Sequence, residues 1–140
     1  MTEGAGLPPR CGIDTVAIAR IERLLRETPE EDLRSLFSPA ELGDSGEGPG
    51  RAASLAARFA AKEAFSKALG TGIHFPVNWH NVWVENARSG KPSLKFSRPL
   101  ARLLKQRGIA NVYVSITDET GMACAFVVVE GAAPKPRRKG

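Results

Sequence analysis

The sequence predicts a single α+β domain in which one long helix packs on antiparallel β-hairpins. Residues 54–72 are strong helix formers that no proline interrupts, and Gly70 is a good C-terminal stop. Residues 82–84 and 92–96 have strand composition and are separated by a turn, which predicts a hairpin; a second hairpin follows near the end of the chain. A chain of 140 residues is long enough for one domain with a real core.

The first predicted elements are a strand and a helix. Residues 1–10 are rich in glycine and proline, so we expect a flexible leader. Residues 11–16 have strand composition except for Asp14, an acid that strands disfavour and that is costly to bury without a partner. Asp14 therefore either caps the next helix or serves a function. From residue 17 onward apolar residues recur at helical spacing, and three arginines lie off that stripe: Arg20, Arg23 and Arg26.

Two helix-start signals follow. Residues 28–31 and residues 38–41 each place a hydroxyl residue before a proline and end in an acid. This order supplies an N-cap, a proline at the first helical position and a capping-box carboxylate, so we expect a short helix after each. The first helix should extend to Leu36. The glycine-rich residues 43–50 are expected to form a flexible loop before the long helix.

The long helix has two contrasting faces. Small and apolar residues share one side, which predicts its packing face: Ala57, Ala60, Ala61, Ala64, Phe65 and Ala68. The opposite half carries polar and ionisable residues: Arg58, Lys62, Glu63, Ser66 and Lys67. This half is either a solvated surface or a site for an anion held through a metal ion. The like charges of Arg58 and Lys62, four residues apart, favour the second interpretation, as do Leu55 and Phe59 among them.

The second half of the chain is expected to alternate strands, turns and one helix. Residues 70–72 have a backbone free enough to present N–H groups to a phosphate. Residues 75–81 are irregular, and a helix between the two hairpins ends at Gly108. Residues 112–117 alternate apolar and polar side chains, as half-buried strands do, whereas residues 122–129 are apolar on both faces, which is typical of a central strand.

Composition limits the location and the partners. We find no apolar signal segment and no apolar run of membrane-spanning length, so we expect a cytoplasmic protein that does not enter a membrane. Cys11 and Cys124 fit neither a metal cluster nor a disulfide framework, and both are expected to be buried packing residues. The net charge of +5 permits an acidic partner of any class. Residues 131–140 are expected to form a disordered basic tail, without the aromatic residues that nucleic-acid binding favours.

Three stretches carry a specific likeness to a known family. The first is Gly12-Ile13-Asp14 with Arg20-Ile21 after it. The second and longest is residues 58–68 followed by Gly70, Thr71 and Gly72, and the third is Gly90-Lys91-Pro92. Together with the closing hairpin they resemble the holo-acyl-carrier-protein synthases, which are 4′-phosphopantetheinyl transferases of the short-chain type. The likeness covers residues 11–130, which we take as the domain.

The resemblance implies an enzyme that transfers 4′-phosphopantetheine from coenzyme A to a serine of an apo acyl carrier protein, with Mg²⁺ and with release of 3′,5′-ADP. Such enzymes serve fatty acid or polyketide synthesis, and the sequence does not choose between them. The resemblance also implies an acidic carrier protein and a homotrimer with active sites at subunit interfaces. The alanine face of the long helix, with Leu55 and Phe59, is a candidate for that contact.

The resemblance also assigns roles to residues. Asp14 and Glu63 become the metal ligands, in agreement with the preference of Mg²⁺ for one or two carboxylates besides phosphates and water. Lys62 and Lys67, with Arg58 as a further candidate, are the expected cationic stabilisers of the leaving group. Glu63 or a metal-bound water is the expected base. Arg20 and Arg23 are expected to dock the carrier. The residues expected to meet coenzyme A are Arg58, Lys62, Ser66, Lys67, Gly70, Gly72, Lys91 and Pro92.

Two other functions remain open at this stage. Asp118 stands where many members of the family have a histidine that is thought to touch coenzyme A, and an aspartate would repel phosphate. The alternative is therefore a non-catalytic relative that binds coenzyme A or a carrier. The basic net charge leaves a nucleic-acid-binding domain as a third possibility. The presence of Asp14, Glu63 and Lys62 favours the transferase.

Overall fold

The computed structural model describes residues 8–132, so most of the predicted leader and tail lies outside the described residues. The elements are β1 (Arg10–Ala17), α1 (Ile18–Glu27), α2 (Glu30–Leu33), α3 (Pro39–Asp44), α4 (Arg51–Leu69), β2 (Val82–Asn86), β3 (Pro92–Phe96), α5 (Arg98–Gln106), β4 (Ile109–Glu119) and β5 (Met122–Gly131). No helix within this part of the chain is long and apolar enough to cross a membrane.

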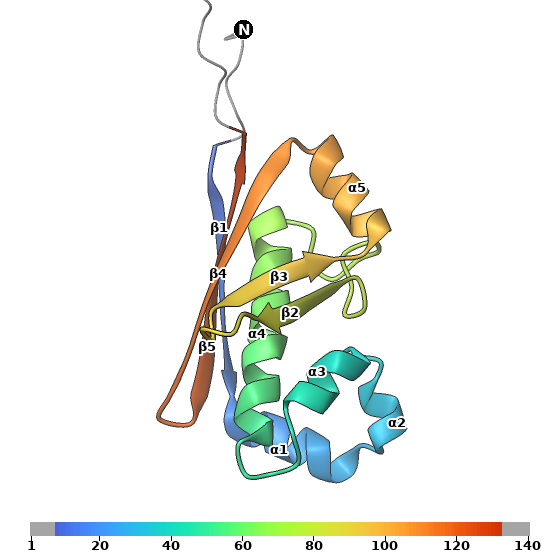
Figure 1. Ribbon diagram of the computed structural model, residues 1–140, viewed down its shortest axis with the longest axis vertical. Coiled ribbons are helices and arrows are strands. Elements are labelled where there is room, and N and C mark those ends of the chain that lie inside the picture. The colour runs from blue at the N-terminus through green and yellow to red at the C-terminus, as the bar shows by residue number, and fades with distance from the viewer. Residues whose placement is uncertain (1–7, 133–140) are drawn as a thin grey trace, which may run out of the picture.

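The α4 helix lies at the centre of the molecule, and the predicted α+β class is confirmed. A three-stranded antiparallel sheet of order β1-β5-β4 runs along one side of α4. The β2–β3 hairpin and the other helices lie on the opposite side (Figure 1). The main core joins α4 to both sides through Val82 and Val84 of β2, Leu100 of α5, and Val127 and Val129 of β5. The β5 strand is central, as its apolar residues on both faces predicted.

The predicted small-residue face of α4 packs on the sheet. Ala60, Ala61 and Ala64 are fully buried, and β1 comes close to the helix at Gly12. A β-carbon built on Gly12 would lie 1.9 Å from the carbonyl oxygen of Ala64, so only glycine permits this approach. The helix ends where the sequence indicated, because Gly70 adopts the left-handed conformation with φ of 74°.

Most of the opposite half of α4 is not a solvated surface. Three of its five polar residues are almost entirely buried: Arg58 at 5% exposure, Lys62 at 0% and Ser66 at 1%. Glu63 is half-buried, and Lys67 is exposed. Leu55 and Phe59 also lie inside the protomer, so the prediction that they contact another subunit is wrong. The physical reason is the central position of α4, which is covered by the sheet on one side and by α1, α3 and β2 on the other.

The capping signals had different outcomes. The capping box of α3 is confirmed: the Glu41 N–H donates to Ser38 Oγ over 3.1 Å, and the Ser38 N–H donates to Glu41 Oε1 over 3.0 Å. The cap predicted before α2 is absent, because Pro29 is the residue before the helix and has no side-chain bond to offer. The α2 helix stops at Leu33, short of the predicted end at Leu36.

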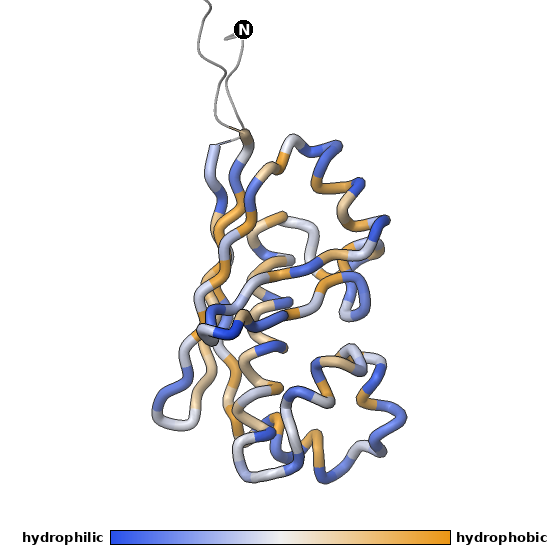
Figure 2. Tube along the Cα trace, in the orientation of Figure 1, coloured by the Kyte–Doolittle hydropathy of each residue, from blue (hydrophilic) through white to orange (hydrophobic). Residues whose placement is uncertain are grey.

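The three-stranded sheet leaves its outer face uncovered by any described element. Alternation along each strand places one set of apolar side chains there, with exposures of 57% for Ile13, 54% for Tyr113, 40% for Met122 and 43% for Phe126. Ile13 and Phe126 are direct cross-strand partners. Figure 2 shows orange apolar stretches along the three strands of this sheet, between paler and blue polar ones. The same alternation leaves Cys11 exposed and Cys124 half-buried, so the prediction that both cysteines are buried is wrong.

Candidate functional site

The candidate site lies where β1 faces α4. Strand alternation turns Gly12, Asp14 and Val16 toward the helix, and the close contact at Gly12 brings Asp14 alongside it. Lys67 donates from Nζ to Asp14 Oδ1 over 2.9 Å and to the Ile13 carbonyl over 3.2 Å. Asp14 does not cap α1, because the N-cap is Ala17 and no side chain bonds there. Of the two predicted roles for Asp14, the helix cap is therefore wrong.

Glu63 lies on α4 one turn before Lys67 and interacts with Asp14. Burial, followed by the negative charge of Asp14, raises the pKa of Glu63; Lys67 and Arg20 act in the opposite direction. The hydrogen bond to Asp14 is the largest of the effects that raise the pKa of Lys67. The structure thus brings together Asp14, Glu63 and Lys67, two carboxylates and one ammonium group.

This carboxylate pair suits a magnesium ion. Burial and then the negative charge of Asp14 raise the pKa of Glu63, and a bound cation would offset both effects. Within residues 8–132 we find no group of three or more His, Cys, Asp or Glu side chains arranged to hold a metal ion. A site with two carboxylates leaves further positions to substrate oxygens and water, which is how Mg²⁺ is commonly bound.

The two predicted docking arginines lie on α1 in different surroundings. The Arg20 guanidinium carbon lies 5.4 Å from the centre of the Phe59 ring, and its charge acts on Glu63. Arg23 forms a solvent-exposed ion pair with Glu27 over 3.0 Å. Only Arg20 is thereby linked electrostatically to the carboxylate pair.

A cleft of about 410 Å³ opens between the start of α4, the β2–β3 turn and β4. Its walls include Ser54, Arg58, Gly90, Pro92 and Asp118. Arg58 donates from Nη1 to the hydroxyl and carbonyl oxygens of Ser54, whereas its buried Nε finds no acceptor among the described residues. The structure therefore brings Arg58 and Pro92 to one cleft, together with the carboxylate of Asp118; Lys91 occupies the exposed turn between Gly90 and Pro92.

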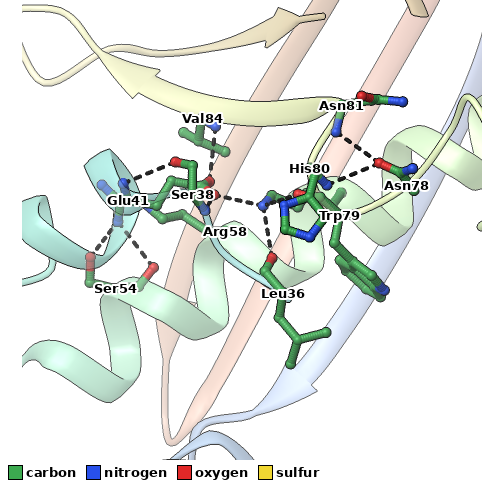
Figure 3. Close-up of polar contacts among 11 residues, drawn as sticks. Leu36, Ser38, Glu41, Ser54, Arg58, Asn78, Trp79, His80, Asn81 and Val84 are labelled. Atoms are coloured by element: carbon green, nitrogen blue, oxygen red, sulfur yellow. Dashed lines mark hydrogen bonds and ion pairs between the residues drawn. The ribbon is translucent and has the colours of Figure 1, made fainter. Parts of the chain in front are cut away.

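Lys62, which the sequence suggested as a contact for coenzyme A and its leaving group, points into the core instead of toward the carboxylate pair. Its Nζ donates to Glu41 Oε1 over 2.6 Å, to the Trp79 carbonyl over 2.9 Å and to the Leu36 carbonyl over 3.0 Å (Figure 3). Burial lowers the pKa of Lys62, and the charge of Glu41 opposes that change. Three acceptors inside the protein occupy the ammonium group, so it is not available to a bound phosphate in this conformation.

Ser66 and the N–H groups of Gly70 and Thr71, which the sequence suggested as ligand contacts, are bonded within the protein. Ser66 is buried and donates from its hydroxyl to the Glu63 carbonyl over 2.7 Å. The N–H groups of Gly70 and Thr71 bond to the carbonyls of Lys67 and Ser66 and close the end of α4. Those two N–H groups are therefore already satisfied. Gly72 has a φ of 63°, a conformation that favours glycine.

Glu41 is the residue that the sequence analysis did not single out beyond its capping role. It is 1% exposed, and both of its carboxylate oxygens are bonded within the core. One signal in the sequence could have pointed to Glu41. Charged and apolar residues mixed on one half of α4 suggest that Lys62 is buried, and a buried lysine requires a buried acid nearby.

Comparison with known proteins gives a consistent result. The family model described as the 4′-phosphopantetheinyl transferase superfamily matches residues 10–127. The holo-[acyl-carrier-protein] synthase of Trichlorobacter lovleyi is 44% identical over 119 residues, which cover 85% of this chain and 94% of that protein. The corresponding enzyme of Nitrosomonas europaea is also 44% identical over 119 residues, with 85% and 95% covered.

Solved structures agree with these sequence matches. The crystal structure of the holo-[acyl-carrier-protein] synthase from Neisseria meningitidis superimposes with a TM-score of 0.79 at 36% identity, covering 86% of this chain and 96% of that one. The Helicobacter pylori enzyme, in complex with coenzyme A, gives a TM-score of 0.75 at 31% identity, with 85% and 98% covered.

Proposed function

This chain belongs to the 4′-phosphopantetheinyl transferase superfamily, and we propose that it acts as a holo-[acyl-carrier-protein] synthase whose transfer site is built around Asp14 and Glu63. The reaction moves 4′-phosphopantetheine from coenzyme A to a serine hydroxyl of an apo acyl carrier protein and releases 3′,5′-ADP. The observation that carries the site is the pair of interacting carboxylates held between β1 and α4, with Lys67 beside them. A cytoplasmic location is part of the same proposal.

The chemistry of the transfer explains what these side chains do. The serine oxygen forms a bond to the phosphorus that carries pantetheine, and the bridging P–O bond breaks with its electron pair leaving on 3′,5′-ADP. A Mg²⁺ ion held by Asp14 and Glu63 would supply neutralisation of the pyrophosphate charge. Lys67 adds a positive charge that its hydrogen bond to Asp14 holds in place. Glu63 or a metal-bound water is the proposed acceptor of the serine proton.

The cleft beside Arg58 is the proposed binding site for the nucleotide part of coenzyme A. The buried Nε of Arg58 lacks an acceptor among the described residues, and a phosphate oxygen would provide one. Lys91 and Pro92 lie at the turn that borders this cleft, and the carboxylate of Asp118 lines it as well. Lys62 and Ser66, which the sequence placed with the ligand, are left out of the proposed contacts because they are buried.

The proposed assembly is a homotrimer, and the outer face of the sheet is its proposed contact. Ile13, Tyr113, Met122 and Phe126 expose apolar surface there that no described element of the protomer covers. Burial of such a face in a second copy would be favourable at about 25 cal/mol per Å² of apolar surface. The proposed carrier is acidic, because the exposed side of α1 carries Arg20, Arg23 and Arg26.

Intact-mass spectrometry tests the proposed reaction directly. Apo acyl carrier protein is incubated with this protein, coenzyme A and Mg²⁺; transfer adds roughly 340 Da to the carrier. We expect no gain with Asp14→Ala, with Glu63→Ala or after chelation of the metal, whereas Glu85→Ala, at an exposed carboxylate on β2, should behave as the unmodified protein does. Binding of coenzyme A without a mass gain on several carriers would support the non-catalytic alternative instead.

A further inference from the structure

The network around Lys62 joins three elements that are distant in the sequence. Glu41 of α3 accepts from Lys62 Nζ and from the Ser38 N–H on Oε1, and from the Val84 N–H of β2 on Oε2 over 3.1 Å. Both partners of the ion pair have fully buried side chains. Such a pair is costly to desolvate and is weak evidence for stability by itself, so its geometry calls for another explanation.

Lys62 also fixes the segment that carries Trp79. The ammonium group donates to the Trp79 carbonyl over 2.9 Å (Figure 3). The side chain of Asn78, just before Trp79, accepts from the N–H groups of His80 and Asn81, just after it. Asn81 in turn donates from Nδ2 to the Pro76 carbonyl over 2.8 Å. The backbone of this turn is thus held at several points.

Trp79 links this turn to the candidate site. Its ring stacks on Phe59 with centroids 4.8 Å apart and an angle of 22° between the planes. The guanidinium of Arg20 lies over the same Phe59 ring, 5.4 Å from its centre. Among the described residues Arg20 forms no ion pair within 4.0 Å, so the ring of Phe59 is its identified side-chain contact.

We propose that Glu41 and Trp79 are positioning residues, which act through Lys62 and Phe59 to hold Arg20 in the orientation that docks the carrier protein. This inference rests on the proposed function, in which Arg20 meets the acidic carrier. Glu41 fixes Lys62, Lys62 fixes the turn at Trp79, and the Trp79 ring holds Phe59 beneath Arg20. Neither Glu41 nor Trp79 needs to touch a substrate in this arrangement.

A double-mutant cycle between Trp79 and Arg20 tests the inference, because residues that act through one another are not additive. Trp79→Leu should raise KM for the carrier about fivefold while KM for coenzyme A and kcat stay within about twofold. In the Arg20→Ala background, Trp79→Leu should cause no further increase. Trp79→Phe, which keeps a stacking ring, should restore most of the affinity for the carrier. Trp83→Leu on β2, outside the network, is the matched control.

The same comparison is made for the ion pair. Glu41→Gln should raise KM for the carrier when Arg20 is present but not in the Arg20→Ala background. The control is Glu30→Gln, which removes the charge of an exposed ion pair with Arg51 and should leave KM for the carrier unchanged in both backgrounds. If Glu41→Gln does not fold, the Trp79 cycle decides the matter. Equal increases in both backgrounds, or equal effects on carrier and coenzyme A, would overturn the positioning role. If the unmodified protein showed no transfer at all, the proposed function itself would be overturned.

Discussion

Gly12 and Ala64 lie so close together that the β-carbon of any other residue at position 12 would clash with the carbonyl oxygen of Ala64, at 1.9 Å, and with the N–H of Ala68, at 2.6 Å. Both contacts are with helix backbone, which has no rotamer by which to move aside. Two residues further along β1 is Asp14. The distance between β1 and α4 therefore sets the distance between the carboxylates of Asp14 and Glu63.

Gly12→Ala should destabilise the protein by about 3 kcal/mol and reduce transfer more than the loss of folded protein explains. The added methyl group must push β1 away from α4 and so separate Asp14 from the helix. Thermal unfolding and activity per folded molecule measure the two effects. Gly43→Ala is the control, since a β-carbon there meets no atom within 4 Å; equal behaviour of the two variants would contradict the prediction.

Lys62→Met should lower the stability of the protein, whereas Lys67→Met should lower its turnover. Loss of Lys62 leaves the carboxylate of Glu41 buried without its cation, which should cost about 3–5 kcal/mol of stability. Lys67 is half exposed, so its loss should leave the melting temperature nearly unchanged while turnover falls. Chemical denaturation and single-turnover kinetics on both variants make the comparison. If Lys62→Met were stable but inactive, Lys62 would have a direct role in the transfer reaction.

Glu63→Gln should raise the melting temperature at pH 7 in the absence of divalent metal. The pKa of Glu63 is raised in the folded protein, so ionisation of this carboxyl disfavours the folded state. That penalty is absent when the group is protonated in both states, appears as the pH rises past the usual value of 4.5, and is complete above the raised pKa. The gain from Glu63→Gln should therefore shrink as the pH falls toward 4 and below. Melting curves at several pH values, with chelator present, measure this difference in melting temperature. A difference that became larger at acid pH would contradict the prediction.

Phe126→Asp should break the proposed trimer. The side chain is 43% exposed in the protomer and pairs with Ile13 at the centre of the outer sheet face, where a buried charge would be costly. Sedimentation velocity should then show monomers. Phe75→Asp is matched to it, because Phe75 is 76% exposed and lies outside the sheet, and it should leave the assembly intact. A monomeric unmodified protein would rule out the assembly.

Arg20→Glu should raise KM for the carrier far more than KM for coenzyme A, because the reversed charge repels an acidic partner. The effect should weaken as salt increases, since exposed charges are screened. Steady-state kinetics at two salt concentrations provide the measurement. Comparable changes in both KM values would place Arg20 at the coenzyme A site.

Local patterns in the sequence were sufficient for most of the fold. The apolar residues on both faces of β5 placed it at the centre of the sheet, and the Ser38 to Glu41 spacing gave the start of α3. These signals are read from neighbouring residues, and local spacing determines them physically. The cap expected before α2 was wrong because a proline at the N-cap position offers no hydroxyl.

The candidate site was predictable only in part. The anomalous acid at Asp14 and the polar half of α4 pointed to the correct helix and strand, and the structure brings Asp14, Glu63 and Lys67 together. The inward turn of Lys62 could not be predicted, because its partner Glu41 is 21 residues away in the sequence and their pairing depends on how α3 packs on α4. Helical periodicity assigns residues to faces of a helix, but the packing of other elements decides which faces are buried.

The pairing of β1 has a consequence for the synthesis of the protein. The first strand of the described residues, β1, has β5, the last of them, as its hydrogen-bonded neighbour in the sheet, with Asp14 opposite Ala125. During translation the hydrogen bonds of β1 to its neighbour cannot form until β5 has been synthesised, and contacts so distant in sequence slow folding. A nascent chain that stops before β5 would carry Glu63 and Lys67 on α4 but would lack the strand that holds Asp14 against them.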